Sequence, residues 1–360
     1  MTLSCEGATE LFLPPSTPSR GPGRRSPVFY NPAMAADRDL GVAFARALLP
    51  SEGEPRRGWE MTAATGVRGL RLFHETRAFA SFTFTEANPD ALAVLRDNVA
   101  RFVGTRAVGA DARKVPAEAP FDYVDLDPYG SPVAFVPTAI AAVRAGGVVA
   151  VTATDMMVLA GAQPAACLRR YGARPVRGRL GPEGGLRILL AHLAREARKV
   201  DRSIRPLLAY ARDHYVRAYV EVQDGRGDLV PVDIIDPDRW TGPSVGDRGP
   251  YGPLWLGPLH DATLVGRMEV PDRVARASEV GRFLARLKEE VTVDRPFYYE
   301  ANVLAQRLHL SAPPALGTVE DGLRRLGFRV ARTHARPEAF RTDAPRADVE
   351  GLFRRLARAA

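Results

Sequence analysis

The sequence predicts an α/β fold: a doubly wound, mainly parallel sheet followed by a smaller α/β domain. The 360 residues suit about two domains at roughly 150 residues each, and 46% hydrophobic residues are enough to form buried cores. Short apolar runs alternate with amphipathic stretches over residues 58–154. A turn-rich and proline-rich connector follows at 223–256, and we expect the second domain to begin near it.

The first five predicted strands are short apolar runs, most of them followed by a stretch with helical periodicity. Strands that alternate with helices form parallel sheets with helices on both faces, so this order indicates a doubly wound arrangement. The strands are expected at 58–63, 82–86, 106–112, 121–127 and 146–154, with helices near 67–76, 89–102 and 132–144.

A longer helix and two further strands complete the first domain. Four leucines recur at helical spacing within 185–199, which predicts a helix with one buried face. Two strand-like runs follow, at 205–211 and 214–222, and bring the predicted sheet to seven strands.

The chain is expected to divide into three segments. Residues 14–27 are rich in Pro, Ser, Gly and Arg, a composition typical of a loosely tethered segment. We therefore expect a flexible N-terminal segment over 1–25, the sheet domain over 26–225, and a C-terminal domain over 226–360.

The C-terminal domain shows the element order of a winged helix. Two predicted helices, at 297–310 and 313–328, precede an arginine-rich β-pair at 329–345. This order favours docking onto nucleic acid, although a small packing domain with ordinary surface charge would show the same pattern.

The charge of the chain favours a polyanionic partner such as RNA. The net charge is +8, and lysine occurs only three times, so nearly all the cations are arginines, whose planar fork binds phosphate oxygens bidentately. Residues 169–217 hold thirteen Arg and Lys against four acidic residues, which predicts one basic face. The alternative is a generally arginine-rich composition with solvated charges.

Several classes of protein are not indicated. No run approaches the ~20 apolar residues that span a bilayer, and the N-terminus lacks a signal-peptide pattern, so we expect a cytoplasmic protein. Cys5 and Cys167 are too few for a disulfide framework or a four-thiolate zinc site, and no metal is expected. The sequence leaves the oligomeric state open, with a monomer as the expectation.

Polar groups follow the first three predicted strands and indicate a nucleoside-containing cofactor. Gly66 lies in the turn Ala64–Gly69, where two glycines allow a tight strand-to-helix turn and a close approach of backbone to ligand. Glu86 ends the second strand and can accept both ribose hydroxyl protons. Asp111 and Ala112 end the third strand and offer a carboxylate and a backbone amide to an adenine ring, although Asp111 could instead cap the next helix.

The segment Asp125–Gly130 is the strongest candidate for catalysis. Strand alternation places Asp125 and Asp127 on the same face, with Asp127 at the tip. A carboxylate there can accept the hydrogens of an exocyclic amine on a nucleobase and take up its proton. Pro128 stiffens the turn, and Tyr129 offers a ring on which a flipped base can stack. The alternative is a capping or Walker-B-like turn.

Several unusual runs, in order over residues 26–350, show a resemblance to one family: SPVFYNPAMAADRDL, ATGVRGLR, DLDPYGSP, VTATDMMVLAG, YGPLWLGPLHD and RTHARPEAF. The chain resembles the tRNA (guanine-26, N2) dimethyltransferases of archaea and eukaryotes. The resemblance implies a class I methyltransferase domain of Rossmann-like fold, S-adenosylmethionine as cofactor and tRNA as partner.

By the same resemblance, the family's cofactor residues fall on Arg38, Arg68, Glu86, Asp111 and Ala112, and its catalytic aspartate falls on Asp127. Arg38 would reach the methionine carboxylate of the cofactor, or lie on a helix surface. The chain departs from the family at Glu60 and Glu86, where Asp is usual, and at Tyr129, where Phe is usual. Some relatives carry four cysteines before GPLWLGPL, but residues 221–252 hold none, so zinc is not expected.

Two other functions remain open at this point. An NAD-dependent oxidoreductase would explain the glycine turn and Glu86 but would leave Asp127–Gly130 without a role. A catalytically silent tRNA-binding or chaperone protein would explain the arginines alone. The sequence also leaves open whether one or two methyl groups are transferred, with dimethylation as the expectation.

Overall fold

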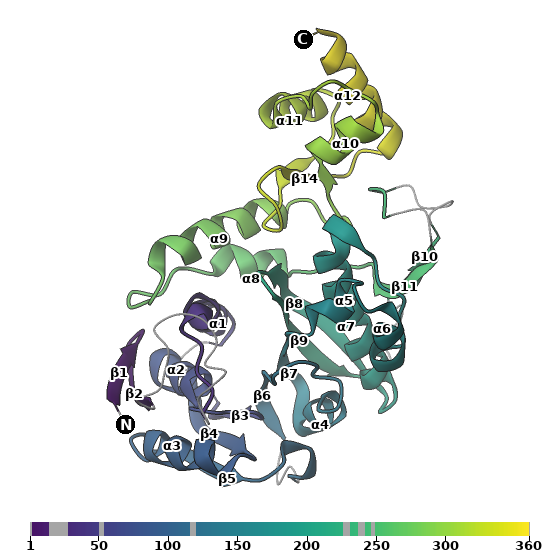
Figure 1. Cartoon of the computed structure of the whole chain (residues 1–360). Helices are drawn as coiled ribbons and strands as arrows, with labels where there is room; N and C mark the ends of the chain where they lie inside the picture. Colours follow the sequence, from purple (N-terminus) through teal and green to yellow (C-terminus); the bar gives the residue numbers. More distant parts are fainter. Residues whose placement is uncertain are drawn as a thin grey trace.

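The sheet domain in this computed structural model has the predicted architecture. The structure describes residues 2–13, 28–49, 54–115, 120–225, 231–236, 242–245 and 249–359. Seven strands form one sheet in the order β5-β4-β3-β6-β7-β9-β8, and only β9 runs antiparallel to its neighbours (Figure 1). The strands are β3 (Arg56–Glu60), β4 (Phe79–Glu86), β5 (Thr105–Gly109), β6 (Phe121–Leu126), β7 (Val143–Ala153), β8 (Arg202–Arg212) and β9 (Tyr215–Asp224).

Helices cover both faces of this sheet, as the alternation of strands and helices predicts. Each face has its own continuous apolar core. One face carries α4 (Val136–Ala142), α5 (Met156–Leu159), α6 (Pro164–Tyr171) and α7 (Gly181–Arg198). The other carries α1 (Ala35–Leu48), α2 (Val67–Thr76), α3 (Pro89–Val99), α8 (Ala262–Arg267) and α9 (Ala277–Glu290).

The long helix α7 confirms the leucine periodicity over 185–199. Leu186, Leu189, Leu190 and Leu193 are all buried against the sheet. Helix α1 was not predicted as an element, because it is buried along most of its length and its sequence lacks a polar face.

The first residues of the chain form a packed hairpin. Strands β1 (Thr2–Glu6) and β2 (Thr9–Leu13) pair antiparallel, and Leu11 and Leu13 pack on Val67 of α2. The Asn98 side chain on α3 both accepts from and donates to the backbone of β2. This hairpin lies within the segment that we expected to be flexible, whereas residues 14–25 of that segment lie outside the described residues.

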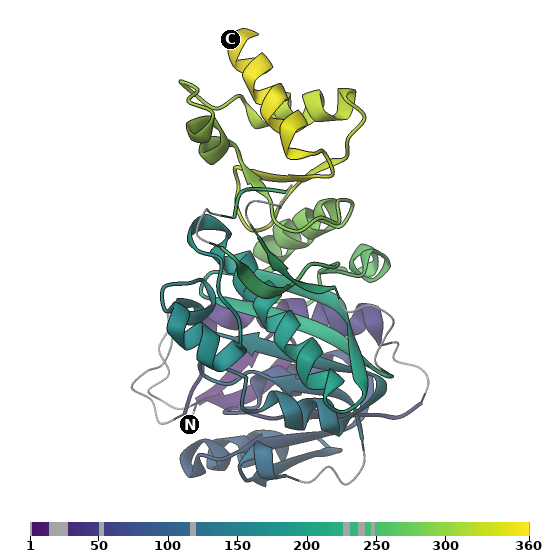
Figure 2. The same ribbon diagram turned by 90° about the vertical axis from the view of Figure 1, so that its right-hand side faces the viewer.

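The C-terminal residues form a separate body at one end of the molecule (Figure 1, Figure 2). Its helix, helix and β-pair follow the predicted winged-helix order, and the last helix was not predicted. A three-stranded sheet in the order β12-β14-β13 packs with the helices around one apolar core. The elements are β12 (Tyr299–Glu300), α10 (Ala301–Arg307), α11 (Leu316–Arg325), β13 (Val330–Arg332), β14 (Ala339–Thr342) and α12 (Arg346–Ala359).

The segment between the two bodies packs on the sheet domain. Strands β10 (Val232–Ile235) and β11 (Tyr251–Trp255) form a hairpin, and Trp255 joins the core beside α7. Helices α8 and α9 pack on α1. Residues that we placed in the C-terminal domain by sequence therefore contribute to the cores of the first, because their apolar side chains pack on both faces of its sheet. No helix among the described residues is long and apolar enough to cross a bilayer.

A buried arginine joins the C-terminal body to the sheet domain. Arg341 on β14 lies 2.8 Å from the Glu183 carboxylate on α7 and 2.6 Å from the Glu290 carboxylate on α9. All three side chains are nearly inaccessible to solvent. Burial alone would raise the pKa of Glu183, but the charges of Arg341 and Arg187 outweigh it and lower that pKa below its ordinary value. The two bodies are thus connected by paired buried charges.

We expect Arg341→Met to lower the free energy of unfolding by about 3–5 kcal/mol, because it leaves two buried carboxylates without their shared cation. Chemical unfolding followed by circular dichroism measures the loss. The matched control is Arg329→Met: Arg329 is 65% exposed and pairs with Asp343, so its loss is expected below about 1 kcal/mol. Equal losses in the two variants would contradict a special role for the buried network.

Candidate active site

The candidate site lies at the carboxyl end of the sheet, between β3 and β6. The chain continues from β3 to β4 on one side and returns to β6 on the other, which makes this position the switch point of the doubly wound sheet. Glu60, Glu86 and Asp127 stand at or directly after the ends of β3, β4 and β6. Ligands of open α/β sheets bind at such a position.

The turn between β3 and α2 requires glycine at two positions for two different reasons. Gly66 has φ +76°, and a Cβ there would lie 2.7 Å from a methyl carbon of Leu95. A Cβ at Gly69 would lie 2.6 Å from the Glu60 carboxylate. Gly66 therefore permits the tight turn as predicted, whereas Gly69 permits α2 to pack closely on β3.

Glu86 is held in place by the backbone around it. One carboxylate oxygen accepts from Ala64 N–H at 2.7 Å, and the other accepts from Asn88 N–H at 2.8 Å. Ala64 itself has a positive φ of 48°. The carboxylate is thus fixed beside the glycine turn.

Asp111 performs the capping role that we kept as an alternative. Its carboxylate accepts from Arg113 N–H at 3.0 Å and pairs with the Arg113 guanidinium at 2.6 Å. These hydrogen bonds lower the pKa of Asp111 to about 2. Ala112, the first residue of the short 3-10 helix η2 (Ala112–Lys114), is buried. Asp111 lies at the end of β5 on the same sheet edge as Glu86.

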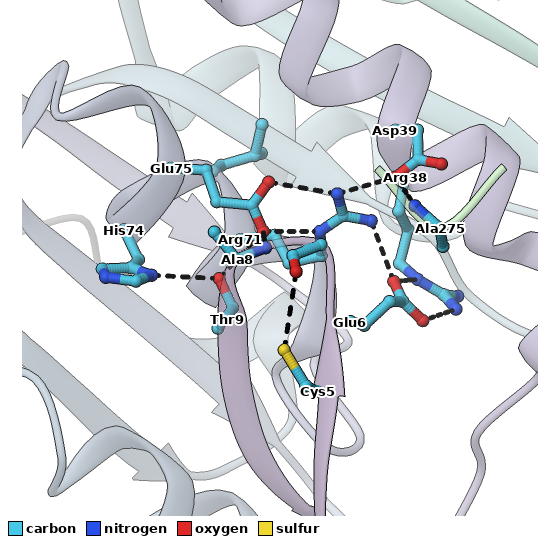
Figure 3. Close-up of polar contacts among 12 residues, drawn as sticks. Cys5, Glu6, Ala8, Thr9, Arg38, Asp39, Arg71, His74, Glu75 and Ala275 are labelled. Atoms are coloured by element: carbon cyan, nitrogen blue, oxygen red, sulfur yellow. Dashed lines mark hydrogen bonds and ion pairs between the residues drawn. The ribbon is translucent and has the colours of Figure 1, made fainter. Parts of the chain in front are cut away.

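Arg38 lies inside the protein, not on a helix surface, and it holds a carboxylate of the N-terminal hairpin (Figure 3). Its Nε and Nη2 donate to the two oxygens of Glu6 at 2.6 and 2.5 Å, and Nη2 also donates to the Asn31 carbonyl. The guanidinium lies over the Tyr30 ring. No local sequence pattern indicated Glu6, because this contact joins residues far apart in the chain.

A second buried arginine extends this cluster. Arg71 on α2 pairs with Glu6 at 3.0 Å, Asp39 at 2.7 Å and Glu75 at 2.8 Å (Figure 3). Burial alone would raise the pKa of Glu6, but the charges and hydrogen bonds of Arg38 and Arg71 outweigh it and lower the pKa to about 2. The hairpin is therefore fixed to α1 and α2 by charge.

Arg68 links three aspartates at the centre of the site. It donates from Nε and Nη2 to one oxygen of Asp127, at 3.1 and 2.6 Å. Its Nη2 also lies 2.8 Å from the Asp37 carboxylate, and its Nε lies 3.8 Å from Asp125. One side chain on α2 thus connects α1 to the end of β6.

Asp125 and Asp127 share a face of β6, as alternation predicts, but they have different surroundings. The Asp125 side chain is fully buried and accepts from Arg217 at 2.7 Å and from the Tyr123 hydroxyl at 2.9 Å. The Asp127 side chain is 24% exposed. Arg68 donates to its Oδ2 alone, and no donor among the described residues contacts Oδ1. Asp125 therefore stabilises the fold through its buried contacts, whereas the partly exposed Asp127 side chain offers its Oδ1 as a hydrogen-bond acceptor.

The charges of this centre leave an excess of negative charge. Asp37, Asp125 and Asp127 surround Arg68 and Arg217, so three carboxylates face two guanidiniums. Burial would raise the pKa of Asp37, but the charges of the two arginines lower it to about 2, so this carboxylate is ionised at neutral pH. A cationic ligand complements such a site.

Two exposed aromatic rings lie close to Asp127: Tyr129, two residues after it, and Phe29, which packs on Tyr129. Tyr129 is 80% exposed and Phe29 is 44% exposed, with ring centroids 6.5 Å apart in an edge-to-face arrangement. Pro128 is buried behind them. Gly130 N–H donates to the Thr154 hydroxyl at 2.8 Å, which fixes the loop to the end of β7. Sequence reasoning missed Phe29; its place in the run SPVFYNPAM was the available signal.

Several polar atoms beside the glycine turn are buried without a partner. Among the described residues these are the Thr62 and Thr65 hydroxyls and the Nη1 of Arg68. Native proteins leave few buried polar groups unpaired, so a cluster of them next to a switch point indicates the place of a ligand. In the described part of the chain, no group of three or more His, Cys, Asp or Glu residues could hold a metal ion.

Two of the arginines of 169–217 cannot belong to the basic face that we predicted. Arg187 and Arg217 are fully buried and pair with Glu183 and Asp125. The sequence count of cations in this stretch included arginines whose side chains face the core. The net charge of a stretch does not show which of its side chains are buried. Part of this stretch therefore stabilises the fold.

Comparison with known proteins identifies relatives over nearly the whole chain. A family model described as N2,N2-dimethylguanosine tRNA methyltransferase matches residues 18–229 and 245–354. A tRNA (guanine(26)-N(2))-dimethyltransferase of Pyrococcus furiosus is 38% identical over 354 residues, covering 89% of this chain and 91% of the relative. The enzyme of the same name from Pyrobaculum arsenaticum is 33% identical over 375 residues, covering 98% of each chain.

A solved structure shares the whole architecture. The complex of Trm1 from Pyrococcus horikoshii with S-adenosyl-L-methionine superposes with a TM-score of 0.85 at 32% sequence identity. The match covers 98% of this chain and 99% of that one. Both the sheet domain and the C-terminal body are therefore common to the two proteins.

We expect Glu60→Gln to make stability less dependent on pH. Burial and the charge of Asp125 raise the pKa of Glu60 well above its ordinary value, so the folded protein keeps a proton that the unfolded chain loses above about pH 4.3. At pH values between the pKa of Glu60 in the unfolded chain and its pKa in the folded protein, each rise of one pH unit therefore lowers the free energy of unfolding by up to about 1.4 kcal/mol. The melting temperature of the variant relative to wild type should rise from pH 5 to pH 8.

The control for this measurement is Glu10→Gln, because the Glu10 side chain is 58% exposed and forms only a surface pair with Arg101. Its difference from wild type should stay constant over the same pH range. A constant difference for Glu60→Gln as well would contradict the raised pKa.

Proposed function

This chain belongs to the N2,N2-dimethylguanosine tRNA methyltransferase family, and on that premise we propose that it methylates the exocyclic N2 amine of guanine 26 in tRNA, with S-adenosylmethionine as methyl donor. One observation carries the catalytic assignment. Asp127 stands at the tip of β6, fixed by Arg68 through one oxygen, with its other oxygen free of donors from the described residues. It lies at the switch point beside the glycine turn.

The residues at the strand ends fit the cofactor. S-adenosylmethionine supplies a methyl group that is already activated by a sulfonium charge, so no metal or covalent nucleophile is needed. We assign the Gly66 turn and Glu86 to the ribose of the cofactor, and Asp111 and Ala112 to its adenine. The excess negative charge around Arg68 favours a cation, and the unpaired Thr62, Thr65 and Arg68 groups support a ligand at this position. We assign Arg38 and Arg68 to the amino-acid end of the cofactor.

Asp127 acts on the amine. The lone pair of a guanine N2 is delocalised into the ring, which makes it a poor nucleophile. A carboxylate that accepts an N–H hydrogen bond increases electron density on nitrogen and can take the proton that leaves on methylation. Arg68 holds this carboxylate in one orientation, so the amine is positioned for in-line transfer. After one transfer the amine still carries a hydrogen for Asp127, which supports dimethylation.

The aromatic rings of Tyr129 and Phe29 hold the target guanine base. A guanine inside a folded tRNA is stacked, so the enzyme must take it out of the stack. Tyr129 and Phe29 present exposed rings close to Asp127, and base–aromatic stacking compensates for lost stacking in the tRNA. Pro128, buried behind Tyr129, stiffens the loop that carries this ring.

The rest of the partner lies outside the catalytic centre. The C-terminal body has the element order of a winged helix, and we assign tRNA docking to it and to the exposed arginines of 169–217. The chain would act as a monomer in the cytoplasm, where its tRNA substrate is found.

A labelled-methyl assay tests the function directly. The purified protein, S-adenosylmethionine and a tRNA transcript should give labelled N2-methylguanosine and N2,N2-dimethylguanosine, identified by nucleoside mass spectrometry. A transcript with adenine at position 26 is the control, because it offers no N2 amine. Product on both transcripts, or on neither, would contradict the proposal, and binding of NADH in preference to S-adenosylhomocysteine would favour an oxidoreductase.

We expect Asp127→Asn to reduce the rate of methyl transfer by about 10²–10⁴-fold, because the amide cannot take up a proton. Calorimetry with S-adenosylhomocysteine and filter binding with tRNA should show affinities close to those of wild type. The matched control is Asp122→Asn, at the opposite end of β6, where Asp122 pairs with Arg144 and should not affect turnover. Wild-type turnover by Asp127→Asn would contradict the catalytic role.

We expect Tyr129→Ala to raise KM for tRNA, or lower kcat/KM, by about 5- to 100-fold, corresponding to a stacking contribution of ~1–3 kcal/mol. Tyr129→Phe keeps the ring and should behave like wild type. Phe29→Ala should show a smaller loss in the same direction, because Phe29 is the less exposed ring. An alanine variant at position 129 with unchanged kcat/KM would exclude stacking on this side chain.

A further inference from the structure

A cavity of about 220 Å³ lies between the sheet domain and the C-terminal body, apart from the catalytic centre. One wall comes from the short helix η3 (Gly178–Leu180), which precedes α7, and the other comes from β12, α10 and α12. Figure 1 shows the C-terminal body, which carries α10 and α12, at one end of the sheet domain. The residues that bear on its chemistry are Arg177, Leu180, Tyr299, Glu300, Val303 and Arg307.

Two buried polar atoms in the wall have no partner. The Tyr299 hydroxyl and the Oε1 of Glu300 form no hydrogen bond within the described residues, although both side chains are about 95% buried. The other oxygen of Glu300 pairs with Arg179 at 2.6 Å. Adjacent buried acceptor and hydroxyl groups without partners indicate a ligand that supplies the missing hydrogen bonds.

The rest of the lining combines apolar side chains with four arginines, Arg177, Arg179, Arg307 and Arg346, and one further carboxylate, Glu350. Leu180 and Val303 lie on opposite walls, and Val303 is unusually exposed for a large apolar residue. Arg177 and Arg307 are exposed, and neither pairs with a carboxylate among the described residues. A flat apolar group with N–H donors would fill the interior, and an anion would bind at the rim.

This cavity is next to the catalytic edge of the sheet. Helix α5 begins just after the carboxyl end of β7, and Gly161 follows α5. Gly161 lies against Arg177: a Cβ added at Gly161 would come within 2.7 Å of the Arg177 side chain. The loop Asp127–Gly130 is attached to the same end of β7 through the hydrogen bond from Gly130 N–H to the Thr154 hydroxyl. Arg177, which lines the cavity, therefore lies against the segment that follows the carboxyl end of β7.

We propose that the cavity is a second nucleotide-binding site, which holds one unpaired nucleotide of the tRNA while guanine 26 is in the catalytic centre. Glu300 and Tyr299 bind a base that carries an exocyclic amine, and Arg177 and Arg307 bind its phosphates. The site rests on the proposed function for its partner, but not on Asp127 or on the cofactor. It would fix the tRNA across the two bodies, which are otherwise joined by the Arg341 network.

Tyr299→Phe tests the hydrogen-bonding group alone. It should weaken tRNA binding by about 3- to 10-fold, as expected for one lost hydrogen bond. Because the hydroxyl has no partner among the described residues, the melting temperature should stay the same or rise. Unchanged tRNA affinity would overturn the assignment of this hydroxyl, and a lower melting temperature would show that it has a structural role.

Val303→Trp tests occupancy of the cavity by filling its mouth. It should weaken tRNA binding by at least ~5-fold while the kcat at saturating tRNA stays within twofold. The matched control is Leu326→Trp, an equally exposed apolar residue at the end of α11 that does not line the cavity. Equal effects of the two tryptophans would overturn the proposal.

The rim is tested by the salt dependence of binding. Arg307→Gln should reduce the slope of log affinity against log salt by about 1, as expected when one phosphate contact is lost. Arg325→Gln, an exposed arginine on α11 outside the cavity, is the control and should leave the slope unchanged. An unchanged slope for Arg307→Gln would exclude a phosphate contact there.

Saturation-transfer NMR with single nucleotides separates this site from the catalytic one. AMP, GMP and CMP should give saturation-transfer signals with the wild type. Val303→Trp should reduce these signals, and Tyr129→Ala should preserve them. UMP, which lacks an exocyclic amine, should bind more weakly. Equal signals from all four nucleotides in wild type and Val303→Trp would overturn the proposal. If the wild type binds tRNA but does not methylate it, the proposed function fails while this binding site remains testable.

Discussion

The ion pair between Arg68 and Asp127 is the interaction on which the candidate active site depends. Arg68 sits in the first turn of α2, directly after the glycine turn, and it reaches both Asp37 on α1 and Asp127 at the tip of β6. One side chain therefore couples the glycine turn to the carboxylate that we propose as catalytic. Removing a buried guanidinium from so many partners would leave several carboxylates uncompensated, so the geometry of the centre is over-determined.

A second layer of buried charge supports the first. Glu6 on the N-terminal hairpin binds both Arg38 and Arg71, which project from α1 and α2, the helices that carry Asp37 and Arg68. The hairpin is thus part of the support of the site and not an appendage. Charged groups serve here as the fixed frame, because separating a buried ion pair would leave an uncompensated charge inside the protein.

The two bodies of the molecule are joined by the same kind of contact. Arg341 connects β14 to α7 and α9, and the cavity beside α10 lies across the same junction. A tRNA bound to both bodies would thus contact two sites at a fixed separation, with guanine 26 in the catalytic centre and a second nucleotide in the cavity. On the proposed function, this arrangement would let the small C-terminal body orient the tRNA toward Asp127.

The sequence by itself determined the strands, the glycine turn, the strand-tip acid Asp127 and the family, because strand alternation, turn chemistry and short motifs depend on near neighbours in the chain. The tertiary structure alone decided which charges are buried and what they bind. Glu6 meets Arg38 only after the hairpin packs on α1 and α2, and Arg217 meets Asp125 only once β9 lies beside β7. Such pairs join residues far apart in sequence, and no local pattern specifies which side chains burial will bring together.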